Sequence, residues 1–224
     1  MAKVYCFGDS NGYGSDLLPG EKPFVHWLAT AMGVEYCNYA EEGSSLGIVQ
    51  HRLVVRHKEI TKDDFVVVII PPDARWYDES EEAGFFSFAN YDIVEYYEQF
   101  LKEKTLEWFE YHHALFTYTI QQLLNNIGCE YVMILTAGRL GGQHYNLPID
   151  YTKFLSDEDM LNFLSREKNI WDNYPHHVLP KEHRFMHLGA PQDFWDLSSP
   201  YIGSGGHPTE LGHKRIAEMI LARI

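Results

Sequence analysis

The chain has 224 residues, of which 45% are hydrophobic, and these numbers predict one domain with a sizeable core rather than two domains. Its 32 acidic and 18 basic residues give a formal charge of −14, which argues against a nucleic-acid partner, because such a surface needs clustered cations. No run of about 20 apolar residues is present, so no segment is expected to span a membrane.

The pattern of apolar residues predicts strands that alternate with helices. The expected strands are 3–7, 35–39, 64–70 and 131–135, and the expected helices are 23–33, 45–58, 93–127, 157–171 and 209–223. The run at 64–70 is continuously apolar, which is typical of a central parallel strand covered on both faces. Segments 73–92, 138–156 and 172–206 are predicted to be irregular. This order predicts an α/β fold in which helices cover a parallel sheet, with residues 1–224 as a single domain.

Polar residues follow each predicted strand at its carboxyl end. They lie in segments 8–10, 41–44, 71–73 and 137–139. In a parallel sheet these ends meet at one edge, where ligands bind. Ser10 follows the first strand, and His207 precedes the last helix. We expect the two to meet there, with Ser10 as nucleophile and His207 as base in chemistry on an acyl group.

Three cysteines form no disulfide framework, because their number is odd and none is spaced as Cys-x-x-Cys. They are interpreted as small core residues in a reducing compartment. Residues 1–7 have the pattern of a core strand and not of a secretory signal peptide. The expected location is therefore cytoplasmic or intracellular, and association with a virion stays open.

Two blocks at opposite ends of the chain resemble the SGNH/GDSL hydrolase superfamily of esterases and acyl-processing enzymes. They are Gly8-Asp9-Ser10 with Asn11 after the first strand, and His207-Pro208 before the last helix. Between them, 38–40 with Gly43-Ser44 is similar to the second block of the family. The resemblance implies a flavodoxin-like three-layer α/β/α sandwich. It also implies an acyl-enzyme on Ser10, and no cofactor.

Two blocks depart from the family pattern. The third block should carry an asparagine that completes the oxyanion hole, but Pro72 stands in its place. Three residues before His207 the family has an aspartate, and this chain has Ser204. An orienting carboxylate fixes the histidine tautomer. We therefore predict a Ser10–His207 dyad with Asp196 as the candidate third member and Asp193 as an alternative. A backbone carbonyl or Ser204 itself could hold the histidine instead.

The remaining site residues are assigned with the resemblance in view. Asp9 is expected to support the turn by accepting hydrogen bonds from backbone amides. The predicted oxyanion-hole donors are the backbone N–H groups of Ser10 and Gly43 and the side chain of Arg75. The predicted substrate-binding residues are Asn11, Ser44 and Trp76.

Each assignment has a purely structural alternative. Ser10 could serve only as a helix N-cap. His207 could be a surface histidine before a helix, and Gly43 could be an ordinary turn glycine. The aromatic residues within 76–88 fit a small satellite core as well as a substrate surface. No metal site is predicted, since His112 and His113 point about 100° apart on a helix and no His-Glu-x-x-His motif is present.

Three functional readings remain open. The first is a serine esterase that cleaves a small ester, such as an O-acetyl group on a carbohydrate. The second is an acyltransferase with the same Ser10–His207 pair. The third is a catalytically degenerate binding or structural module, which the missing asparagine and aspartate favour.

Overall fold

The computed structural model describes residues 2–71, 75–77, 85–87, 106–135, 146–155, 200–203 and 207–224. Within them, a parallel sheet is formed by four strands: β1 (Lys3–Phe7), β2 (Glu35–Asn38), β3 (Phe65–Ile70) and β6 (Glu130–Leu135). The strands lie in the order β2-β1-β3-β6, so β1 is an interior strand between β2 and β3. This is the doubly wound order of flavodoxin-like sheets.

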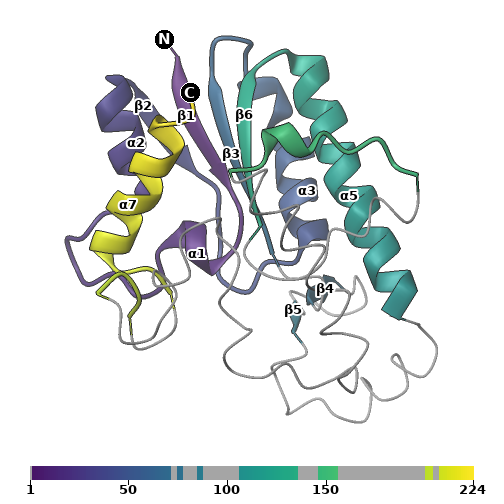
Figure 1. Cartoon of the computed structure of the whole chain (residues 1–224), viewed down its shortest axis with the longest axis horizontal. Coiled ribbons are helices and arrows are strands. Elements are labelled where there is room, and N and C mark those ends of the chain that lie inside the picture. The colour runs from purple at the N-terminus through teal and green to yellow at the C-terminus, as the bar shows by residue number, and fades with distance from the viewer. Residues whose placement is uncertain are drawn as a thin grey trace.

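Helices cover both faces of the sheet (Figure 1). α2 (Phe24–Met32) and α7 (Glu210–Leu221) lie on one face, and α3 (Leu46–Arg56) and α5 (Leu106–Ile127) lie on the other. Successive residues of β1 divide between the two cores, with Val4 packing in the α2–α7 core and Tyr5 in the α3–α5 core. This confirms the predicted α/β/α sandwich. No helix in the described residues is both long and apolar enough to cross a membrane.

The helix ends explain why these segments begin and end where they do. α2 ends at Gly33, whose φ of 69° is favourable for glycine and whose N–H donates to the Ala29 and Thr30 carbonyls. α3 begins after Ser45, whose hydroxyl accepts a hydrogen bond from the Ile48 N–H. α7 begins after Thr209, which caps the Gly212 N–H in the same way.

Two short elements differ from the sequence prediction. β4 (Arg75–Tyr77) and β5 (Phe85–Ser87) pair antiparallel within 73–92, where an irregular loop was predicted. That prediction was wrong for these six residues because aromatic residues favour extended pairing even in runs of three. α1 (Ser10–Tyr13) is not among the predicted helices either, since four residues with a central glycine carry no helical periodicity. The predicted helix at 157–171 lies outside the described residues.

A buried histidine joins α7 to α2. His213 is fully buried, and its Nδ1 accepts a hydrogen bond of 3.1 Å from the N–H of Phe24, the first residue of α2. That N–H has no partner within its own helix, and Pro23 offers no side-chain cap. Burial, and secondly the charge of nearby His207, lowers the pKa of His213 to about 3. A neutral imidazole therefore holds the two helices together.

We predict that this histidine makes the fold sensitive to acid. Its ordinary pKa is 6.5, so below that pH the unfolded chain binds a proton that the folded protein excludes. The free energy of unfolding should therefore fall by about 1.4 kcal/mol for each pH unit between pH 6.5 and about pH 3. Denaturant unfolding of the wild type and of His213→Asn, which keeps an acceptor but does not titrate, measures this contribution. Equal pH dependence in the two proteins would contradict it.

Candidate active site

A tight turn after β1 places Ser10 at the sheet edge. The Asp9 carboxylate caps α1 by accepting a hydrogen bond of 3.0 Å from the Asn11 N–H, the role expected from the sequence, and Ser10 is the first residue of the helix. A Cβ atom at Gly8 would lie 2.6 Å from Ile69 Cβ, and one at Gly12 would lie 2.7 Å from Ile69 Cδ1. Only glycine at these two positions lets α1 lie so close to β3.

Backbone contacts between residues 200–203 and 207–209 fix His207 at the start of α7. Ile202 and Pro208 form an isolated antiparallel bridge, and the Gly203 N–H donates a hydrogen bond of 2.8 Å to the His207 carbonyl. These bonds hold His207 just before the helix, because segments 200–203 and 207–209 run side by side.

Ser10 and His207 meet, although 197 residues separate them in sequence. The distance from Ser10 Oγ to His207 Nε2 is 3.0 Å, which is a hydrogen-bonding distance. Ser10 is only 4% exposed, and the imidazole is partly exposed. With Nε2 unprotonated, the serine O–H donates to it, which is the arrangement of a nucleophile beside its general base.

Asp16 contacts the same histidine and is not among the residues predicted from the sequence. Its Oδ2 accepts a hydrogen bond of 3.1 Å from the His207 N–H, and its Oδ1 lies 3.7 Å from His207 Nδ1. The sequence predicts the acid upstream of His207, at Asp196 or Asp193, whereas Asp16 follows Ser10 by six residues. Its nearness to the nucleophile in sequence was the available signal. Asp193 and Asp196 lie outside the described residues.

The loop after β2 is attached to the turn that carries Ser10. The Asn38 side-chain amide donates to the Gly12 carbonyl at 2.9 Å and accepts from the Ala40 N–H at 3.1 Å. The Glu41 N–H donates to the Gly8 carbonyl at 3.1 Å. Gly43 follows with a φ of 72°, a conformation that favours glycine. The loop with Gly43 therefore starts from the same sheet edge as Ser10.

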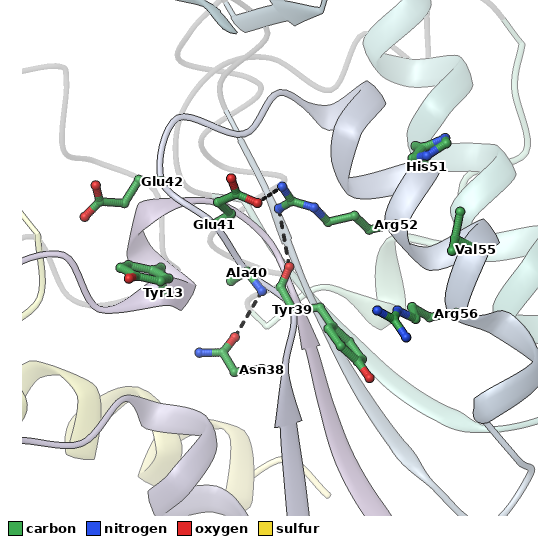
Figure 2. Close-up of a pocket in the computed structure, with 10 residues that line it drawn as sticks. All are labelled: Tyr13, Asn38, Tyr39, Ala40, Glu41, Glu42, His51, Arg52, Val55 and Arg56. Atoms are coloured by element: carbon green, nitrogen blue, oxygen red, sulfur yellow. Dashed lines mark hydrogen bonds and ion pairs between the residues drawn. The ribbon is translucent and has the colours of Figure 1, made fainter. Parts of the chain in front are cut away.

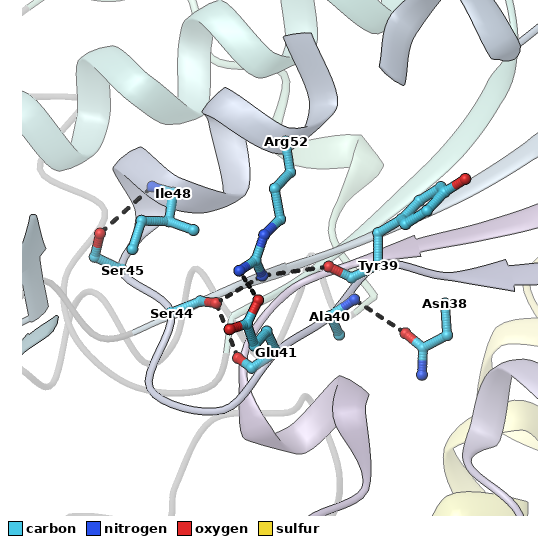
Figure 3. Close-up of polar contacts among 8 residues, drawn as sticks. All are labelled: Asn38, Tyr39, Ala40, Glu41, Ser44, Ser45, Ile48 and Arg52. Carbon is cyan, nitrogen blue, oxygen red and sulfur yellow. Dashed lines mark hydrogen bonds and ion pairs between the residues drawn. The ribbon is translucent and has the colours of Figure 1, made fainter. Parts of the chain in front are cut away.

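Arg52 of α3 holds this loop from the other side (Figure 3). Its guanidinium donates to Ser44 Oγ at 3.1 Å and to the Tyr39 carbonyl at 3.4 Å, and it forms an ion pair with the Glu41 carboxylate. Ser44 is fully buried, and its hydroxyl also donates to the Glu41 carbonyl at 2.9 Å. Ser44 was predicted to bind substrate, and here its hydroxyl is engaged within the loop. Burial lowers the pKa of Arg52.

A pocket of about 670 Å³ lies beside the loop, between the outer surface of α3 and the end of α1 (Figure 2). Its walls include Tyr13, Glu41, His51, Arg52, Val55 and Arg56. Neither Ser10 nor His207 lines it. The pocket is therefore separate from the reacting pair, although Tyr13 belongs to the same short helix as Ser10.

The other predicted site residues have different outcomes. The Asn11 side chain donates to the Asp9 carboxylate at 3.2 Å, so it is part of the turn. Arg75 and Trp76 lie on β4, and the side-chain roles predicted for them fall outside what the structure describes. No group of three or more histidine, cysteine, aspartate or glutamate residues in the described part of the chain is placed to hold a metal ion.

Comparison with known proteins identifies the fold. No protein-family model matches the chain, and no curated protein sequence matches it significantly. A lipase from a goat rumen metagenome is 15% identical with a TM-score of 0.53, over 100% of this chain and 97% of the lipase. The protein YXIM from Bacillus subtilis is 12% identical with a TM-score of 0.50, over 99% of this chain and 55% of its own.

A lipolytic protein of the G-D-S-L family from Veillonella parvula is also similar, with 12% identity and a TM-score of 0.49, over 99% of this chain and 97% of that protein. The chain thus shares its fold with the goat-rumen lipase. At such low identities, the likeness establishes the fold and leaves the activity to be argued from the site.

We predict that Arg52 stabilises the loop after β2. Arg52→Met should lower the free energy of unfolding by about 1–3 kcal/mol, because buried Ser44 then lacks a donor. The ion pair with Glu41 should contribute little, since that carboxylate is half exposed. Denaturant unfolding at pH 7 measures the change. Arg215→Met, which removes an exposed ion pair on α7, is the control and should change stability by less than about 0.5 kcal/mol. Equal effects would contradict this role.

Proposed function

We propose that the protein is a serine esterase that cleaves a small ester through an acyl-enzyme on Ser10. The observation that supports this most directly is the 3.0 Å distance between Ser10 Oγ and His207 Nε2. A serine hydroxyl is a weak nucleophile by itself and needs an adjacent base to accept its proton. We assign the role of that base to His207.

The reaction follows from these two side chains. His207 Nε2 takes the proton of Ser10 while Oγ attacks the ester carbonyl, and a tetrahedral oxyanion forms. His207 then gives the proton to the leaving alcohol, and the acyl group stays on Oγ. Water attacks the acyl-enzyme, loses its proton to His207, and releases the acid as Ser10 regains its hydrogen. Capture of the acyl group by another alcohol would make the same site a transferase.

The oxyanion needs hydrogen-bond donors. We assign this role to the N–H groups of Ser10 and Gly43, because the first N–H groups of a helix have no partner within it and Gly43 allows close approach. Arg75 is the proposed third donor. Proline at position 72 has no N–H and no side-chain donor to replace the family asparagine. If Arg75 does not substitute, the rate should be about 10²- to 10³-fold below that of a complete site.

The proposed substrate class is supported by the sequence resemblance and by a solved structure of similar fold. The protein of similar fold from the goat rumen metagenome is a lipase, which supports ester chemistry. We take an O-acetyl group on a carbohydrate as the specific candidate and short-chain acetates as the first probes.

We predict that a fluorophosphonate probe labels Ser10 and that a chromogenic acetate ester is hydrolysed. Ser10→Ala should abolish labelling, and His207→Ala should slow labelling and turnover by at least about 10³-fold, because Ser10 then has no base. Mass spectrometry of the labelled peptide and initial rates measure these effects. His26→Gln, which alters a half-buried histidine of α2 in contact with Trp27 and Tyr36, serves as the control.

One result favours the alternative function. A folded wild type that neither labels nor hydrolyses any acetate would rule out the esterase. It would support a binding or structural module, as the missing asparagine and the serine at position 204 also do.

A further inference from the structure

We infer that Asp16 is the positioning carboxylate for His207, supplied from the loop after α1 instead of from the segment before the histidine. This inference rests on the proposed function of the Ser10–His207 pair. It gives that pair a third member at a position where the resemblance did not place one.

The first argument is that Asp16 is anchored to His207 by the backbone. Asp16 Oδ2 accepts the His207 N–H at 3.1 Å, so the carboxylate is fixed relative to the residue that it would orient. The second oxygen, Oδ1, lies 3.7 Å from the ring Nδ1. This is about 0.8 Å longer than an ordinary N–H···O hydrogen bond. A small rotation of either side chain closes that gap, and catalytic hydrogen bonds are commonly long before substrate binds.

The second argument is the state of Nδ1 itself. This atom is buried and has no hydrogen-bond partner among the described residues. A buried polar nitrogen without a partner is unfavourable by about 1–3 kcal/mol, so an acceptor is expected beside it. Asp16 Oδ1 is in that position, and its side chain is only 17% exposed. A carboxylate at Nδ1 favours the tautomer with hydrogen on Nδ1. Nε2 is then left free to accept the Ser10 proton.

The third argument is the space that Gly203 provides. A Cβ atom at this position would lie 2.5 Å from Asp16 Oδ2 and 3.0 Å from Asp16 Cγ. The Gly203 N–H also donates to the His207 carbonyl at 2.8 Å. One glycine therefore leaves room for the carboxylate and holds the histidine that the carboxylate contacts.

The path of the chain keeps Asp16 near Ser10. The Gly14 and Ser15 N–H groups both donate to the Ser10 carbonyl, at 3.0 and 3.3 Å, and the Leu17 N–H donates to Gly14 at 3.1 Å. These bonds fold residues 10–17 back on themselves. Ser10 and Asp16 are therefore carried by the same hydrogen-bonded turn, and His207 contacts both of them from the far end of the sequence.

The main test compares Asp16→Asn with Asp16→Glu. Asparagine keeps the size of the side chain and removes its charge, so we expect labelling of Ser10 by the fluorophosphonate to slow by about 10²- to 10⁴-fold. Glutamate should recover part of the rate. Gly203→Ala should slow labelling as well, by displacing Asp16. The matched control, Asp63→Asn on the surface, should label within about twofold of the wild type. Asp196→Asn tests the rival acid predicted from the sequence, and it should not reproduce the loss if Asp16 orients His207.

A second measurement reads the histidine directly and needs no activity. In ¹⁵N-labelled Ser10→Ala protein at pH 8, nitrogen spectra should place the neutral-ring hydrogen of His207 on Nδ1. In Ser10→Ala with Asp16→Asn, that hydrogen should move to Nε2 in most molecules. A purely structural role for Asp16 would leave the tautomer unchanged in folded protein.

The outcomes separate this inference from the proposed function. If the wild type labels, and Asp16→Asn labels equally fast with an unchanged tautomer, then Asp16 has no positioning role and the esterase stands. If Asp196→Asn causes the loss instead, Asp196 is the orienting acid and our inference is wrong. If the wild type does not label, the esterase fails. The tautomer comparison still decides the role of Asp16.

Discussion

The hydrogen bond between Ser10 and His207 depends on how the sheet orders the chain. Ser10 follows β1, an interior strand, and His207 precedes α7, which packs beside α2 on one face of that sheet. The contact between His213 and the start of α2 fixes the lateral position of α7. A loop that enters α7 from the carboxyl edge of the sheet therefore reaches Ser10. No local interaction could join residues 197 positions apart.

Close backbone approach is the second constraint on the site. Side chains at Gly8, Gly12 or Gly203 would collide with Ile69 or Asp16. These three glycines let α1 lie against β3 and let the segment before His207 lie against Asp16. The geometry of the reacting pair is thus set largely by main chain held in place by packing. Such support is more rigid than side chains on a mobile loop.

Polar groups hold the loop after β2, in addition to the packing of Tyr39 and Ala40 against the two hydrophobic cores. Arg52 donates to Ser44 and to the Tyr39 carbonyl, and Ser44 donates to the Glu41 carbonyl. Asn38 separately joins the Gly12 carbonyl to the Ala40 N–H. This type of network specifies one loop conformation because each missing partner leaves a buried group unsatisfied. Gly43 has no side chain, so its position depends on the hydrogen bonds of its neighbours Glu41 and Ser44. The pocket on the outer side of the network is a feature of α3 and not of the reacting pair.

The sequence by itself determined the strands of the sheet, the helices around it and the two ends of the chain that meet. These features depend on periodicity and on residue types at element ends, which are local properties. Only the tertiary structure decided that Asp16 contacts His207, that Ser44 turns inward to Arg52, and that His213 caps α2. Each of these contacts joins groups whose distance depends on strand order and loop path. The spacing of residues along the chain determines neither the strand order nor the path of the loops.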